Sequence, residues 1–126
     1  MGFLDRLKSS TNSDHIENWL TLDSKEMVDT AIEKSFEKPV AFFKHSTRCG
    51  ISVQVKTGLE DNWEIEEDNL DMYYLDLLNY REISAYIAEK TGVIHQSPQL
   101  ILVKDGKVSY HQSHFSIKYD ELQALV

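Results

Sequence analysis

Short apolar runs alternate with stretches of helical spacing along this chain, and that alternation limits the possible folds more than any other feature. Residues 40–43 and 100–103 are continuous apolar runs, which is typical of strands buried on both faces of a sheet. The strands that we expect are, in chain order, 16–22, 40–43, 72–78, 99–103 and a return strand through Val108 and Tyr110 after an Asp105-Gly106 hairpin turn.

Apolar residues at helical spacing fall between these strands and after the last one. The expected helices are one with a capping box at Asp23 and Glu26 that includes Phe36 and ends before Pro39, one that starts at or just after Cys49 with Ile51, Val55, Leu59 and Trp63 on one face, one over 81–91 that stops at Gly92, and a last one capped by Ser116 that carries Leu122, Leu125 and Val126.

The resulting order is β-α-β-α-β-α-β-β-α. Strands that alternate with helices imply crossover connections, so we expect an α/β fold with a mixed sheet and helices on both faces. This order matches the thioredoxin fold. A chain of 126 residues has the size of one domain. We place that domain at residues 16–126, after a polar N-terminal arm at residues 1–15.

Charge and apolar content exclude several classes of function. Thirteen Lys and Arg residues stand against 21 Asp and Glu residues, so the net charge of −8 argues against binding to a nucleic-acid backbone. The apolar runs are far too short to cross a bilayer. The chain begins without the apolar core of a secretory signal, and we therefore expect a reducing, cytoplasmic location.

The single cysteine, Cys49, is the main candidate for chemistry. It follows the strand at 40–43 by a short polar loop and falls at the first turn of the next helix, where unpaired backbone N–H groups favour a thiolate. Lys44, His45 and Arg48 lie just upstream and act in the same direction if they point at the sulfur. The alternative is an inert, buried cysteine that packs as a small apolar side chain.

Two further positions support a redox interpretation of Cys49. Ser52 stands where a Cys-x-x-Cys motif has its resolving thiol, so a second thiol from outside the chain must complete any exchange cycle. Ser52 is either a hydrogen-bond donor to the thiolate or an ordinary serine of the first helical turn. Pro98 precedes a buried strand, where a cis peptide bond is found when one occurs, and the order of elements places that loop opposite Cys49. The five histidines show no convincing spacing for a metal site, so we expect none.

Four sequence blocks resemble the monothiol bacilliredoxin family, which comprises thioredoxin-like bacterial proteins of the bacillithiol system. The blocks are KHSTRCGIS at 44–52, YYLD at 73–76 with REIS at 81–84, HQSPQ at 95–99 and SHFSI at 113–117. The resemblance implies a thiol–disulfide oxidoreductase that removes bacillithiol from S-bacillithiolated client proteins, with bacillithiol as the thiol co-substrate and no tightly bound cofactor. It implies that Cys49 is the nucleophile, that Thr47, Arg48, Gly50 and Ser52 form the active-site loop, and that Pro98 is a cis-proline whose neighbours Ser97 and Gln99 align the substrate.

Gly50 departs from the family pattern, in which proline often follows the cysteine. Cys-Gly-Ile-Ser is one residue away from the Cys-Gly-Phe-Ser of monothiol glutaredoxins, which carry [2Fe–2S] clusters. The alternative function is therefore a cluster carrier in which Cys49 and a small thiol supply ligands. Against it, residues 96–98 read Gln-Ser-Pro in place of Thr-Val-Pro, and no Gly-Gly pair follows the hairpin. A third alternative is a binding module whose cysteine is silent.

Overall fold

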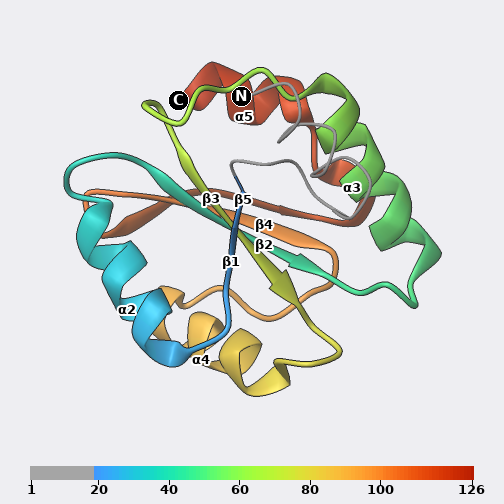
Figure 1. The fold of residues 1–126 in the computed structure, drawn as a ribbon, viewed down its shortest axis with the longest axis horizontal. Helices are drawn as coiled ribbons and strands as arrows, with labels where there is room; N and C mark the ends of the chain where they lie inside the picture. The colour runs from blue at the N-terminus through green and yellow to red at the C-terminus, as the bar shows by residue number, and fades with distance from the viewer. Residues whose placement is uncertain (1–18) are drawn as a thin grey trace, which may run out of the picture.

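Five strands form one mixed sheet between two layers of helices, as the computed structural model of residues 19–126 shows (Figure 1). The strand order across the sheet is β1-β3-β2-β4-β5. The elements are β1 (Trp19–Thr21), α2 (Lys25–Lys34), β2 (Val40–His45), α3 (Gly50–Asn62), β3 (Asp71–Asp76), α4 (Arg81–Thr91), β4 (Gln99–Lys104), β5 (Lys107–Ser113), the 3₁₀ turn η1 (His114–Ser116) and α5 (Tyr119–Leu125). The predicted order of strands and helices is confirmed. The arm at 1–15 and the start of the first expected strand lie outside the described residues.

The directions of the central strands bring three loops to one edge of the sheet. β2 runs parallel to β3 and antiparallel to β4. The carboxyl ends of β2 and β3 and the amino end of β4 therefore meet, at the right-hand side of the sheet in Figure 1. The loop before α3, the loop before α4 and the loop before β4 all belong to this edge.

Strand alternation divides the core into two apolar clusters. Ala41 and Phe43 pack toward α3 and α5, whereas Val40 and Phe42 pack toward α2 and α4, which Figure 1 shows on the opposite face. The same alternation continues to the end of β2. Lys44 therefore faces the α2 and α4 side, and His45 faces the α3 side.

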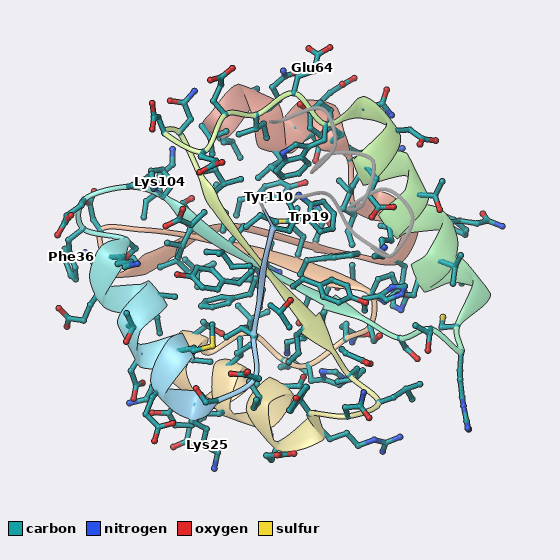
Figure 2. The ribbon with its side chains drawn as sticks, viewed as in Figure 1. Trp19, Lys25, Phe36, Glu64, Lys104 and Tyr110 are labelled. Atoms are coloured by element: carbon teal, nitrogen blue, oxygen red, sulfur yellow. The ribbon has the colours of Figure 1, made fainter. Side chains whose placement is uncertain are left out.

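Several predicted helix boundaries were wrong by a few residues. Ser24, not Asp23, caps α2, because its extended backbone lets Oγ accept a hydrogen bond from the backbone N–H of Met27 at 3.2 Å. Phe36 follows the end of α2 and lies at the periphery of the molecule, 60% exposed (Figure 2). Ser116 closes the η1 turn, and Lys118 is the residue that precedes α5.

Two strand boundaries also differ from the prediction, because β2 continues two residues past the predicted 40–43 and β3 ends at Asp76 instead of Leu78. α4 spans the predicted residues, and Gly92 ends it with a left-handed φ of 77°. Val55 and Leu59 of α3 are buried as predicted, although Ile51 is 37% exposed. Among the helices described between residues 19 and 126, none is long and apolar enough to span a bilayer.

Candidate functional site

Cys49 occupies the capping position immediately before α3. Its backbone is extended, with φ −105° and ψ 117°, and its side chain makes no capping hydrogen bond. The loop and the helix hold its main chain, since Cys49 N–H donates to the carbonyl of Ser46 at 3.2 Å and its own carbonyl accepts from Val53 N–H at 3.0 Å. The thiol is partly exposed. It therefore combines solvent access with the positive end of a 13-residue helix.

Ser52 holds the loop that precedes Cys49. Its side chain is completely buried, and its Oγ accepts a hydrogen bond from the backbone N–H of Ser46 at 3.0 Å. The same Oγ lies 2.7 Å from Nδ1 of His45, at the end of β2. Both hydrogen bonds of this hydroxyl in the described chain thus connect the first turn of α3 to residues 45 and 46, where the loop begins. Thr47 and Arg48 are exposed on that loop, and Gly50 is the first residue of α3.

Lys44 does not meet the condition of pointing at the sulfur. Lys44 belongs to β2, and strand alternation turns its side chain to the face opposite α3. The ammonium lies 3.3 Å from the carbonyl of Ser84 and 3.4 Å from Nδ1 of His95, and the side chain is completely buried. Arg48, by contrast, is on the exposed loop next to Cys49.

The segment 97–99 opens β4 at the same edge of the sheet. The peptide bond between Ser97 and Pro98 is cis, and the Pro98 carbonyl accepts from the His114 N–H at 2.9 Å. Gln99 is buried, and in the antiparallel pairing of β4 with β2 it lies opposite Lys44. Its Nε2 donates to the carbonyl of Ile94, while its Oε1 and the Ser97 Oγ are buried and have no hydrogen-bond partner within residues 19–126. Two buried oxygen atoms near the loop edge are therefore unsatisfied.

A basic cluster that the sequence interpretation did not identify lies on the α4 side of this edge. His95 Nδ1 contacts both Lys44 and, at 2.9 Å, the Oγ of Ser84. Burial lowers the pKa of Lys44 from its ordinary 10.5 to about 8. The pKa of His95 is also lowered, first by burial and then by the positive charges of Lys44 and Arg81. One sequence signal could have revealed the cluster: Lys44 follows Val40 and Phe42 at intervals of two residues, which places all three side chains on the same face of a buried strand.

The ligand set for a metal ion is poor. Across residues 19–126, no group of three or more His, Cys, Asp or Glu side chains converges in a way that could hold a metal ion. A cluster bound at Cys49 would therefore need its other ligands from small thiols or from a second copy of the chain.

Comparison with known proteins assigns this arrangement to a family. The family model described as monothiol bacilliredoxin BrxC matches residues 20–122, which is most of the chain. The chain belongs to the monothiol bacilliredoxin family. The matched segment includes Cys49, the loop before it and the 97–99 segment. The bacilliredoxin assignment, together with the similarity to a solved oxidoreductase of thioredoxin fold, identifies the chain as a thiol redox protein with one cysteine.

Solved structures show the same fold. A protein described as a proposed oxidoreductase with a thioredoxin fold is 30% identical, with a TM-score of 0.69, over 85% of this chain and 92% of that one. The thioredoxin of Malassezia sympodialis is 17% identical, with a TM-score of 0.65, over 90% and 92% of the two chains. Thioredoxin f of spinach chloroplasts is 19% identical, with a TM-score of 0.63, over 90% and 95%. The predicted thioredoxin-like fold is confirmed.

Proposed function

We propose that this bacilliredoxin removes bacillithiol from S-bacillithiolated client proteins in the bacterial cytoplasm. The observation that carries the proposal is the position of Cys49, which is partly exposed at the amino end of α3 and is the only thiol of a chain in the bacilliredoxin family. A thiolate held there is a nucleophile toward disulfides, and a chain without a second cysteine must stop at a mixed disulfide.

The exchange runs in two steps. The Cys49 thiolate attacks the bacillithiol sulfur of the mixed disulfide, so that a new S–S bond forms to Cys49 and the client leaves as a thiolate that takes up a proton. The thiolate of a second bacillithiol then attacks the disulfide at Cys49, which releases the Cys49 thiolate and bacillithiol disulfide. Over the two steps the client cysteine is reduced and the incoming bacillithiol thiol is oxidised, while the bacillithiol taken from the client remains at the disulfide level.

The surrounding residues have distinct roles in this proposal. Arg48 and the backbone N–H groups at the start of α3 stabilise the thiolate, and exposed Thr47 contributes a hydroxyl on the same loop. Ser52 acts through the loop, because its hydroxyl is committed to Ser46 and His45. Residues 97–99 align the substrate, and the Ser97 Oγ beside them is buried and unpartnered within residues 19–126.

The test follows the bacillithiol adduct by intact mass. Reduced protein is mixed with a bacillithiol-modified client, and in parallel with the same client modified by glutathione. We expect the bacillithiol adduct to move to Cys49 faster than the glutathione adduct, and we expect no transfer to the Cys49→Ser variant. Absence of transfer from both donors would refute the exchange reaction. Visible absorbance of purified protein would then favour the cluster carrier, and a colourless protein would favour the silent binding module.

A further inference from the structure

A cavity of about 360 Å³ opens beside the basic cluster, on the α4 side of the edge that carries Cys49. Its lining comes from the end of β3, the first turns of α4 and the loop before β4, namely Leu77, Arg81, Ser84, Ala85 and His95. Lys44 lies behind this wall and contacts two of the lining residues, Ser84 and His95. Three basic side chains from three separate segments therefore converge on one cavity in a chain whose net charge is −8.

Within residues 19–126, no salt bridge balances these positive charges. The salt bridges of this part of the chain join Lys38 to Asp71 and Lys56 to Glu60, so neither Lys44 nor Arg81 forms one. Asp76, at the end of β3, is already engaged, because its carboxylate accepts from the backbone N–H of Leu78 and from Nδ2 of Asn79. A buried ammonium without a counter-ion is costly to stability, and an anion bound beside it would offset part of that cost.

The hydrogen bonds also determine how His95 meets a ligand. An ammonium can only donate, and the Ser84 hydroxyl is a donor as well, so Nδ1 of His95 is the acceptor for its two neighbours. With Nδ1 as the acceptor, the neutral ring carries its proton on Nε2, and His95 is one of the residues that line the cavity. An N–H donor from His95 and the planar fork of Arg81 together match the two oxygens of a carboxylate.

We propose that this cavity binds a carboxylate of the small thiol that Cys49 exchanges, with Arg81 and His95 as direct contacts and Lys44 as a positioning residue behind them. Bacillithiol carries carboxylates on its malate group, so the cavity would hold that group while the sulfur reaches Cys49. This inference rests on the proposed function, because it assigns a binding site to the co-substrate of that reaction.

The test compares two disulfides that differ in charge. Bacillithiol disulfide carries carboxylates, whereas 2-hydroxyethyl disulfide is neutral and has none. With each, the Cys49 thiolate forms one S–S bond and releases one small thiolate, and intact mass gives the rate. We expect Arg81→Gln and Lys44→Met each to slow the reaction with bacillithiol disulfide about tenfold or more, as for the loss of a charge-assisted contact, and to leave the neutral disulfide unaffected.

Lys90→Gln is the matched control, because it removes one positive charge from the last turn of the same helix, away from the cavity lining. Equal slowing of both disulfides by the Arg81 and Lys44 variants, no slowing of either, or an equal effect of Lys90→Gln would overturn the proposal.

Failure of the exchange reaction can be distinguished from failure of the carboxylate site. If wild-type protein reacts with neither disulfide, the proposed function fails, and the cavity is judged by titrating the Cys49→Ser protein with L-malate and with inorganic phosphate. Saturable changes in the amide NMR signals of residues 81–85 and 95 with malate, weaker with phosphate and lost in Arg81→Gln, would support a carboxylate site. No saturable change, or an equal response to phosphate, would overturn it.

Discussion

Replacement of Lys44 by methionine should make the protein more stable at neutral pH. The ammonium is completely buried, and its pKa falls from 10.5 to about 8 because burial disfavours the charged form. At ~1.36 kcal/mol per pKa unit, this difference corresponds to a cost of roughly 3–4 kcal/mol to the folded state at pH 7, as an upper bound. Methionine has a similar length and carries no charge, so it removes the cost without leaving a large cavity.

Two hydrogen bonds of the ammonium are absent from the variant, and their absence offsets part of this gain. The hydrogen bonds from Lys44 to Ser84 and His95 are long, at 3.3 and 3.4 Å. Each therefore contributes no more than about 0.5–1.5 kcal/mol to the free energy of unfolding. His95 keeps its closer contact with the Ser84 hydroxyl at 2.9 Å. We therefore expect a net stabilisation of roughly 1–2 kcal/mol for Lys44→Met at pH 7.

The sign of the pH dependence follows from the direction of the shift. Because the folded-state pKa of Lys44 is the lower one, the unfolded wild-type chain binds more protons between pH 8 and 10.5. Wild-type stability therefore gains from this group as the pH rises through that window, and the advantage of the variant shrinks. Other titrating groups are common to both proteins and cancel in the difference.

Urea unfolding of the two proteins from pH 7 to pH 10 measures this difference directly. Removal of the Lys44 charge should also raise the pKa of His95, since that charge contributes to lowering it, and NMR of the imidazole protons reports the change. A variant less stable than wild type at pH 7, or a difference in stability that does not vary with pH, would refute the reasoning about burial.

Three other substitutions have outcomes that the structure determines. Ser24→Ala removes the cap of α2 and should lower the free energy of unfolding by ~1 kcal/mol in urea titrations. Ser52→Ala deletes a buried hydroxyl with two partners, so stability should fall by about 1–3 kcal/mol and the transfer rate by intact mass should fall with it; unchanged stability would contradict this. Gly50→Pro places proline at the first residue of α3, where an added Cβ meets no atom within 4 Å, so the fold and the exchange activity should persist. We expect that variant to lose any cluster absorbance, and absorbance that survives would sever the link between Gly50 and cluster binding.

The sequence was sufficient for the order of elements, because each strand and helix has a local signal. The apolar runs at 40–43 and 100–103 become the central strands β2 and β4, and Gly92 ends α4 where a left-handed residue is needed. Helix boundaries were less accurate, because neighbouring residues compete to cap: Asp23 and Ser24 are both good caps, and only the backbone conformation selects Ser24.

The basic cluster could not be predicted from local sequence patterns. Lys44 looked like a loop residue beside Cys49, since nothing in the sequence shows that β2 continues to His45. Its contact with His95 joins residues 51 positions apart and depends on how β2, α4 and the loop before β4 come together. Ser52 was recognised as important from its spacing to Cys49, but its hydrogen bonds to the loop required coordinates.

The most direct test of the account is the rate at which Cys49 acquires bacillithiol in the folded and the unfolded chain. Reduced protein is mixed with bacillithiol disulfide, with and without urea, and intact mass with peptide mapping follows the adduct. The account predicts a single adduct on Cys49 that forms about tenfold or more faster in the folded protein, because the fold holds a partly exposed Cys49 at the positive end of α3. No adduct, or one that forms no faster than in the unfolded chain, would contradict the claim that this fold activates Cys49.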